Sequence, residues 1–522
     1  FLFMNKAALI IAVSMLASRV LGILREMLLA HNAGTGLEKN ALDLAFMIPD
    51  ILNHVVSTGF LSIIFIPIFT GYLVSSEEDK SWKFFSNVLT TIGVFLLLLI
   101  IPSFIWMKEL LELFTAADLD ETLLDRATYF GRLILPGQLF IFAGSILVAV
   151  QHTRKQFLIP SLTGVIYNAA IIIGGVLLSS RGLEGFALGV PVGAFIGFFA
   201  LQIWGAHRGG VHYKPIISPF APDFLRYLKM MLPMSLGVGS MFALEFVIRS
   251  FGGAFGSSGI SALNYAYRVM YTLVAVFGFS VGVASYPDMA RLVKEGNLSL
   301  LNQKIWKSLS RMFCVLTAAV ITVWALSFPA VRILFERGAF SRETSELVSN
   351  ILRWYLPVSF GLCLQAVLVR SFYAAERMWT PTILNTGIFA LSIPAYIFTA
   401  PLLDIYSVPV VGASCAIIQV ISMILLWAKR NGKEGMNEAI KNMLLAIISF
   451  GAMIAVALGL DFVFHSFMRE CNFVLLLLFS VISGIILFSL TLFLQSILGS
   501  KDAKDILYEL SGKILRKLHL KK

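Results

Sequence analysis

The chain has 522 residues, of which 58% are hydrophobic and only 14% charged, and its formal net charge is +11. This composition excludes a soluble globular protein, because so much apolar surface exceeds what a soluble core can bury, and it predicts a membrane protein. The four cysteines lie far apart with no CxxC pair, so neither a disulfide framework nor a metal site is expected.

Long apolar runs follow one another along the chain. Runs long enough to cross a hydrocarbon core of ~30 Å predict an all-α polytopic membrane protein with about fourteen transmembrane helices. They lie near residues 7–30, 41–74, 84–107, 123–151, 157–179, 184–205, 224–250, 260–290, 305–328, 344–374, 380–402, 408–428, 438–463 and 472–498. The first run continues past Arg19 with no small-residue cleavage site, so we expect a retained span rather than a leader peptide.

Basic residues between the runs predict the orientation. They concentrate after the even-numbered helices, as at Lys80, Arg154 and Lys429, whereas the connections after odd-numbered helices hold few, among them Lys39. The positive-inside rule therefore places both termini in the cytoplasm. In the tail, apolar residues recur at helical spacing among lysines, which predicts a basic amphipathic helix on the anionic inner leaflet.

The sequence contains a repeat with an offset of 221 residues. For example, Arg132-Leu-Ile-Leu-Pro136 matches Arg353-Trp-Tyr-Leu-Pro357, and residues from about 40 to 165 recur in the same register. Six predicted helices fit within one offset, so the two copies are parallel and form two lobes. The predicted division is an N-lobe at 1–206, a cytoplasmic linker at 207–222, a C-lobe at 223–430, helices 13 and 14 at 431–498, and the tail at 499–522.

Charged residues inside the predicted spans are the main functional signal. They are Arg19, Arg25, Asp43, Asp50, His54, Glu245 and Arg268. An arginine at the centre of a span costs about 2.5–3.5 kcal/mol on insertion scales, so each should face a partner or a wet cavity. One interpretation pairs Arg19 with Glu26 or Asp43, and Arg268 with Glu245. The other places them around a central cavity lined by helices 1, 2, 7 and 8, which explains why they cluster on corresponding helices of both lobes.

We expect a transporter rather than an enzyme, because the chain has no P-loop and no HExxH motif. Repeats and charged spans together favour a carrier, driven by an ion gradient or the membrane potential. Nothing predicts nucleic-acid binding, because the positive charge is distributed along one membrane face. For Arg132 and Arg353, each next to a proline, we favour a structural role in shaping a helix bend.

Several motifs resemble the MurJ/MviN family of lipid II flippases, within the multidrug/oligosaccharidyl-lipid/polysaccharide exporter superfamily. Ser18-Arg-Val-Leu-Gly-Ile-Leu-Arg-Glu26 is similar to the SRxLGxxRD/E opening of that family, and Leu334-Phe-Glu-Arg-Gly-Ala-Phe340 to a second element. Supporting matches are Ala45-Phe-Met-Ile-Pro-Asp50, Tyr265-Ala-Tyr-Arg-Val-Met270 and Arg370-Ser-Phe-Tyr-Ala374. The resemblance runs from about residue 8 to 430.

The resemblance implies a flippase that moves undecaprenyl-pyrophosphate-linked peptidoglycan precursor from the inner to the outer leaflet of the bacterial inner membrane by alternating access. It implies substrate binding by Arg19, Arg25 and Arg268 in a central cavity. Residues expected as ion-coupling groups or cavity partners are Glu26, Asn40, Asp43, Asp50, Asn53, His54 and Glu245. We expect no cofactor beyond a coupling ion such as sodium or a proton, contact with membrane lipids, and function as a monomer.

The chain departs from the family pattern in helix two. Asn40 stands where many members have Asp, Asn53-His54 replaces a basic pair, and Thr58 replaces an acidic residue. In helix eight, Tyr267 precedes Arg268 where an Asp is usual. Three alternatives therefore stay open: a flippase for another lipid-linked oligosaccharide, a cation-coupled multidrug exporter using Asp43, Asp50 or Glu245, and a membrane scaffold that transports nothing.

Overall fold

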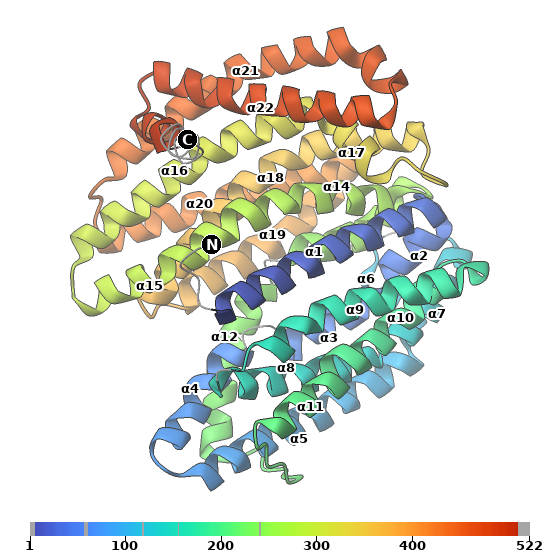
Figure 1. The fold of residues 1–522 in the computed structure, drawn as a ribbon, viewed down its shortest axis with the longest axis vertical. Helices are drawn as coiled ribbons and strands as arrows, with labels where there is room; N and C mark the ends of the chain where they lie inside the picture. Colours follow the sequence, from blue (N-terminus) through green and yellow to red (C-terminus); the bar gives the residue numbers. More distant parts are fainter. Residues whose placement is uncertain (1–5, 57–60, 117–118, 155, 240–241, 510–522) are drawn as a thin grey trace, which may run out of the picture. The chain divides into compact units, whose positions relative to one another are not determined.

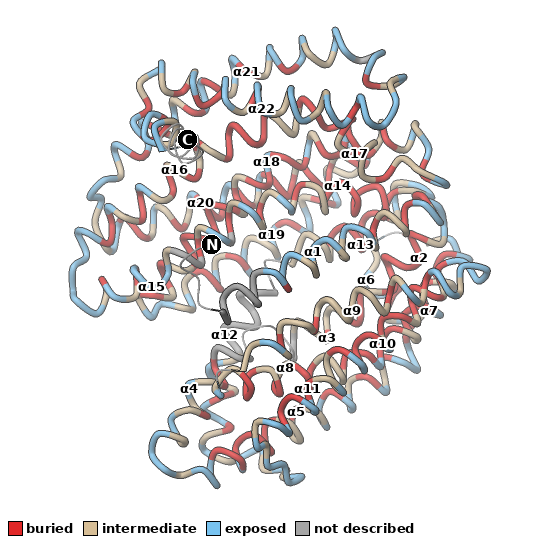
Figure 2. Tube along the Cα trace, in the orientation of Figure 1, coloured by how far each residue is buried: buried red, intermediate tan, exposed pale blue. Residues whose placement is uncertain are grey.

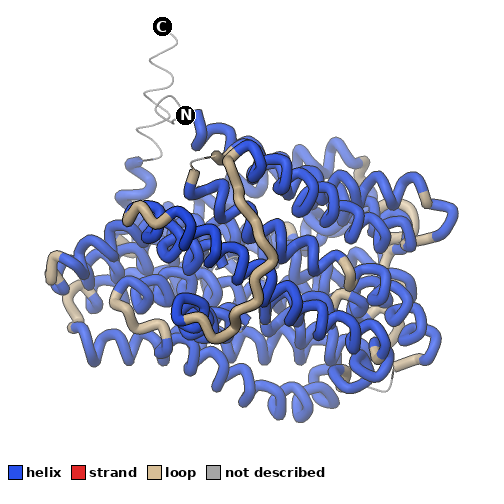
Figure 3. Tube along the Cα trace, turned by 90° about the horizontal axis from the view of Figure 1, so that it is seen from below, coloured by secondary structure: helices blue, strands red, loops and turns tan. Residues whose placement is uncertain are grey.

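The computed structural model describes residues 6–56, 61–116, 119–154, 156–239 and 242–509 (Figure 1). Over these ranges the chain is helical with connecting loops and no strand, which confirms the predicted all-α class (Figure 3). Ten helices in the described ranges are long and apolar enough to cross a membrane, at 78–105, 121–153, 158–177, 184–208, 259–294, 298–325, 342–374, 379–431, 436–464 and 473–497. The predicted count of fourteen is not confirmed, and the 379–431 stretch covers two of the predicted spans.

The chain divides into two compact units. The first contains the residues up to Ser261 together with Arg337–Ser341, and the second contains Ala262–Glu336 and the residues from Arg342 onward. These units are defined by contacts, whereas the predicted lobes are defined by the repeat, so the lobe boundaries stay a prediction. By contacts, the helices expected to open the C-lobe belong to the first unit.

In its described residues the first unit contains thirteen complete α-helices and three shorter helical segments. Its helices are α1 (Lys6–Ala33), α2 (Leu37–Ala45), α3 (Met47–Val56), α4 (Leu61–Val74), α5 (Glu78–Ile105), α6 (Met107–Phe114), α7 (Glu121–Ile134), α8 (Gly137–Thr153), α9 (Leu158–Leu177), η1 (Ser179–Arg181), α10 (Glu184–Gly193), the π-helical η2 (Ala194–Ala200), α11 (Leu201–Arg208), α12 (Pro222–Gly239), α13 (Ala243–Gly252) and η3 (Gly253–Phe255). Within this unit α1 packs on α9, and α9 packs on α10.

The predicted helix 41–74 is divided into α2, α3 and α4. α2 ends at Ala45, and Pro49 follows four residues later in the first turn of α3. Proline has no N–H to donate to the carbonyl of Ala45, and its ring clashes with that carbonyl, so a continuous helix is disfavoured there. Proline is tolerated in the first turn of a new helix, where that N–H would be unpaired in any case.

The second unit continues from the first within α14 (Gly259–Leu273). It contains the π-helical η4 (Val274–Phe279), α15 (Ser280–Lys294), α16 (Leu298–Ala325), α17 (Ser327–Phe335), α18 (Arg342–Ala374), α19 (Trp379–Leu403), η5 (Asp404–Tyr406), α20 (Ser407–Asn431), α21 (Met436–Glu470) and α22 (Phe473–Ile497). In its most apolar part α18 is 72% buried, whereas α22 is only 11% buried (Figure 2). α18 is therefore the central helix of this unit, and α22 presents its apolar surface outward, as a lipid-facing helix does.

The segment between α11 and α12 is fastened to α5 within the first unit. The side chain of Asn87 donates to the carbonyl of Ser218 (2.8 Å) and accepts from its N–H (2.7 Å). The hydroxyls of Tyr213 and Thr90 lie 3.1 Å apart, and the N–H of Lys214 donates to Ser86. This predicted linker is therefore a strap held along α5, and α12, which follows it, packs on α3, α4 and α5 of the first unit.

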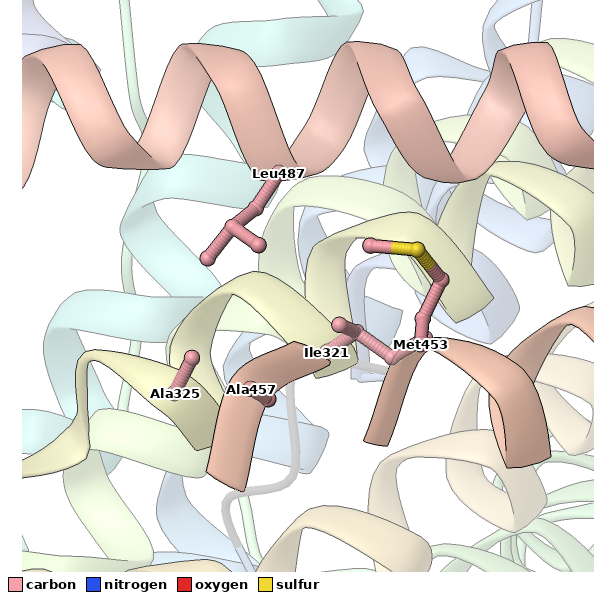
Figure 4. Close-up of a cluster of buried hydrophobic side chains, with 5 residues drawn as sticks. All are labelled: Ile321, Ala325, Met453, Ala457 and Leu487. Carbon is pink, nitrogen blue, oxygen red and sulfur yellow. The ribbon is translucent and has the colours of Figure 1, made fainter. Parts of the chain in front are cut away.

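The last two helices pack against α16 and α17 in the second unit. A buried apolar cluster joins them, made of Ile321, Ala325, Met453, Ala457 and Leu487 (Figure 4). The guanidinium of Arg332 donates to the carbonyls of Met468 (2.6 Å) and Cys471 (2.9 Å), where α21 ends. These contacts attach the two helices that lie outside the repeat to the second copy.

The beginning of the predicted tail is also attached to the second unit. Residues 501–509 are helical. The carboxylate of Asp502, which is only 6% exposed, accepts hydrogen bonds from Ser310 and from Asn442 (2.9 Å). The part of the tail from 510 to 522 lies outside the described residues, so its place on the inner leaflet stays a prediction.

Candidate functional site

The arginines of α1 differ in their surroundings. Arg25 donates to Oδ1 of Asn168 on α9 (3.1 Å) and forms an ion pair with Glu26 (3.1 Å). Asn168 is itself oriented, because its Nδ2 donates to the carbonyl of Gly164 (2.9 Å). Arg19 is exposed, and it makes no hydrogen bond or ion pair with any residue in the described ranges. Arg25 is therefore held in one orientation, whereas Arg19 presents an exposed cation.

α2 contains a buried ion pair that the sequence reasoning missed. Lys39 Nζ lies 2.5 Å from the carboxylate of Asp43, and the two side chains are 1% and 5% exposed. We had assigned Lys39 to a loop, but α2 begins at Leu37, so Lys39 lies one helical turn before Asp43 on the same face. The predicted pairing of Arg19 with Asp43 or Glu26 is not seen, because Lys39 pairs with Asp43 and Arg25 with Glu26.

A second charge cluster joins α3 to α13. Arg249 Nη2 lies 2.8 Å from Asp50 and 3.8 Å from Glu245, and the Arg249 side chain is 10% exposed. Arg249 was not predicted, although Glu245 and Arg249 are four residues apart and so share one face of a helix. Beside this cluster the ring of His54 stacks on Phe242, with centroids 4.2 Å apart. The arrangement places two carboxylates around one guanidinium, next to an imidazole.

The other predicted residues of helix two have different environments. Asn40 is 1% exposed and donates to the carbonyl of Ser257. Asn53 is half-buried on α3, and Thr58 lies outside the described residues. Asn40 is thus fixed within the fold rather than available to a cavity.

Arg268 lies on α14 in the second unit and is half-buried. Arg19, Arg25 and Glu245 belong to the first unit. The predicted cavity between the lobes and the predicted pair of Arg268 with Glu245 therefore stay predictions.

The two repeat-related arginines make local contacts of the kind a structural role requires. Arg132 donates to the carbonyls of Phe104 (2.9 Å) and Ile105 (3.0 Å) at the end of α5. Arg353 donates to Ser327 (2.8 Å) and pairs with Asp461 (2.9 Å). Both guanidinium groups are occupied by the protein itself, unlike that of Arg19.

The two arginines of α1, Arg19 and Arg25, offer positively charged groups to a ligand. No cluster of three or more His, Cys, Asp or Glu side chains able to hold a metal ion occurs in the part of the chain that the structure describes. An exposed guanidinium presents a planar fork of donors that matches the oxygens of a phosphate, and its attraction strengthens where water is scarce. Arg19, with Arg25 about 1.7 turns further along α1, can therefore receive an anionic group.

Comparison with known proteins gives the family. The model of the family "Lipid II flippase MurJ" matches residues 29–482. A probable lipid II flippase MurJ of Treponema pallidum is 22% identical over 400 residues, covering 74% of this chain and 75% of the relative. One of Borreliella burgdorferi is 23% identical over 505 residues, covering 95% and 97%.

Two solved structures share the fold. A lipid II flippase MurJ in an inward closed conformation matches with a TM-score of 0.76 at 23% identity, covering 96% of this chain and all of the other. An inward-facing multidrug resistance MATE family transporter of the MOP superfamily matches with a TM-score of 0.66 at 14% identity, covering 81% and 99%. The family model covers most of the sequence, and this chain belongs to the lipid II flippase MurJ family.

Proposed function

We propose that this chain is a lipid II flippase, which moves undecaprenyl-pyrophosphate-linked peptidoglycan precursor from the inner to the outer leaflet of the bacterial inner membrane. The observation that carries the proposal is the family match over residues 29–482. The exposed guanidinium of Arg19 supports it, because the substrate is an anion that must cross an apolar layer.

The two arginines of α1 have distinct roles in this proposal. Arg25 is pre-oriented by Asn168 and Glu26, so little side-chain entropy is lost when it meets the substrate. Arg19 has no partner in the described part of the chain, so the pyrophosphate displaces only water from it. Arg268 supplies a third cation from the second unit. The polyprenyl tail stays in the lipid while the headgroup crosses.

Transport proceeds by alternating access, in a monomer with both termini in the cytoplasm. Membrane potential or an ion gradient supplies the energy, since each charge moved gains ~2.3 kcal/mol per 100 mV. The Asp50–Arg249–Glu245 cluster suits a proton or sodium ion, because two carboxylates around one guanidinium retain a net negative charge. Asp43 is a poorer coupling group, because Lys39 already neutralises it.

Complementation tests the function. In cells depleted of their own flippase, the wild-type chain should restore growth, whereas Arg19→Ala and Arg268→Ala should not. Arg291→Ala is the matched control, because this arginine is 60% exposed and pairs only loosely with Asp288 and Glu295 in its own helix region. Full rescue by either cavity variant at equal surface level would remove that arginine from the substrate path. Failure of a well-expressed wild type would favour another lipid-linked oligosaccharide as the substrate.

Energy coupling needs a separate measurement. Flipping should stop when an ionophore collapses the membrane potential together with the proton and sodium gradients. A Glu245→Gln variant should lose that dependence on one ion while Glu434→Gln, in the loop between α20 and α21, keeps it. Flipping that continues unchanged in the presence of the ionophores contradicts gradient coupling.

A further inference from the structure

One tyrosine of α9 lies between the two groups of charged residues in the first unit. Tyr167 interacts electrostatically both with Arg25 on α1 and with Asp50 on α3. It is half-buried, and its hydroxyl makes no hydrogen bond with any residue in the described ranges. The side chains of Arg25 and Asp50 are 21% and 29% exposed, so a ligand can reach both. A free hydroxyl donor is therefore available between a cation and a carboxylate.

The surrounding helices hold this tyrosine firmly. Its ring packs edge-on against Phe198 of η2, with the ring centroids 5.6 Å apart. Its backbone lies close to α10, because a Cβ at Gly193 would be 2.9 Å from the carbonyl oxygen of Tyr167. The phenol side chain therefore has little freedom to lose when it binds a ligand.

The next residue of α9 does not offer such a donor. Asn168 accepts from Arg25 through Oδ1 (3.1 Å), and its Nδ2 donates to the carbonyl of Gly164 (2.9 Å). Both ends of the Asn168 amide are thus occupied within the fold. Asn168 orients Arg25, whereas the hydroxyl of Tyr167, one residue earlier, stays available to a ligand beside that arginine.

We propose that Tyr167 is a further substrate-binding residue, whose hydroxyl donates to the phosphate group that Arg25 receives, and that Asp50 competes with the phosphate for this hydroxyl. The proposal rests on the proposed function for the identity of the anion. A phenol can donate to a phosphate or to a carboxylate, and a hydrogen bond to an anion is roughly twice as strong as one between neutral groups. The two anions therefore compete for one donor.

This competition links substrate binding to the charge state of Asp50. In this structure Asp50 pairs with Arg249 (2.8 Å), and the hydroxyl of Tyr167 is free. A coupling cation bound at Asp50 also neutralises the carboxylate, which leaves the hydroxyl to the phosphate. Without such a partner the carboxylate binds the hydroxyl and repels the phosphate. Substrate and coupling cation therefore favour each other's binding, and this linkage is reciprocal.

Removal of the hydroxyl alone separates substrate binding from packing. Tyr167→Phe keeps the ring that lies against Phe198, so a purely structural contribution is retained. Tyr129→Phe is the matched control, because Tyr129 on α7 is 40% exposed and loses the same atom. Asp50→Asn removes the competing charge, and its control is Asp125→Asn on α7, where the carboxylate is 60% exposed.

The measurement is the Kd of farnesyl pyrophosphate, a short polyprenyl pyrophosphate, for the full chain in detergent by isothermal titration calorimetry. Tyr167→Phe should weaken binding about tenfold, as expected for the loss of a hydrogen bond to a charged group. Asp50→Asn should tighten binding about fivefold when Tyr167 is present and at most about twofold in the Tyr167→Phe background. Tyr129→Phe and Asp125→Asn should leave the Kd unchanged.

The double variant tests the competition. If Tyr167 acts only on the structure, its substitution changes the Kd by the same factor with either residue at position 50. An equal response to Asp50→Asn in both backgrounds would therefore overturn the competition. Equal Kd values for Tyr167→Phe and Tyr129→Phe would overturn binding by the hydroxyl. Unfolding temperatures show which variants are folded, and the comparison of the two tyrosines stands even if Asp50→Asn is not.

Arg25→Ala locates the probe. It should abolish binding, and unchanged binding would place the probe elsewhere and overturn the role of Tyr167. Failure of the wild type to bind the probe would overturn that role as well. This assay measures binding without transport, so the two proposals can fail separately. Binding that does not depend on Tyr167 leaves the flippase proposal in place, whereas failed complementation leaves the binding result valid.

Discussion

Arg132 and Arg353 occupy the same position in the two repeats but have different partners. Arg132 donates to two backbone carbonyls at the end of α5 and lies over the ring of Phe104. Arg353 reaches the corresponding junction between α16 and α17, where it contacts Ser327 and Trp324. It also pairs with Asp461 on α21, a helix outside the repeat. In the second copy this arginine therefore both contacts its own helix junction and binds α21, the first of the two additional helices.

Loss of the guanidinium should be most damaging in the second copy. The carboxylate of Asp461 is 20% exposed, and its other oxygen is buried with no hydrogen-bond partner in the described ranges. Arg353→Ala would leave that charge without a partner, which should cost about 2–3 kcal/mol, somewhat less than for a fully buried pair. Thermal unfolding of the purified protein in detergent measures the loss.

The Arg353→Ala/Asp461→Asn double variant is the control for this prediction. It removes the stranded charge and should recover more than half of the lost stability. If the double variant is as unstable as Arg353→Ala, the ion pair is not what Arg353 contributes.

The same substitution in the first copy should have a smaller effect. Arg132→Ala removes two hydrogen bonds from exposed carbonyls that water can replace, so a loss of about 1 kcal/mol is expected. Hydrogen–deuterium exchange should increase at residues 104–108 and stay unchanged in α21. An Arg132→Ala effect as large as that of Arg353→Ala would mean that the two copies have not diverged in this respect.

The helical class, the repeat and the charged positions could be predicted from the sequence, because hydropathy and spacing are local properties. The residues that these charged and polar side chains contact could not be predicted. Asp50 meets Arg249 and Asn40 meets Ser261 only through the tertiary fold. The 221-residue offset relates Asn40 to Ser261 in sequence, but it does not predict that the two residues are in contact. Lys39 was placed in a loop because it lies between the predicted spans 7–30 and 41–74, whereas in the structure Asp43, one turn away, makes its burial tolerable.

The helix boundaries also depend on tertiary contacts that local sequence does not predict. The sequence predicted one helix at 41–74, and it did not show that α2 would be a separate short helix whose residues from Lys39 to Ala45 are buried. Likewise, the tail was expected to lie on the inner leaflet, and the burial of Asp502 near its start depends on Ser310 and Asn442 from two other helices.

The length and the exposure of α22 determine how this helix of the second unit fits the thickness of the membrane. Its 25 residues extend about 37 Å at 1.5 Å per residue, which exceeds a hydrocarbon core of ~30 Å. Such a mismatch is accommodated by tilting of the helix or by local thickening of the bilayer. With only 11% of its most apolar part buried, α22 has few neighbours to fix its angle. The surrounding lipid therefore takes a direct part in setting the tilt of the last helix, whereas the tilt of α18 is set by the protein packed around it.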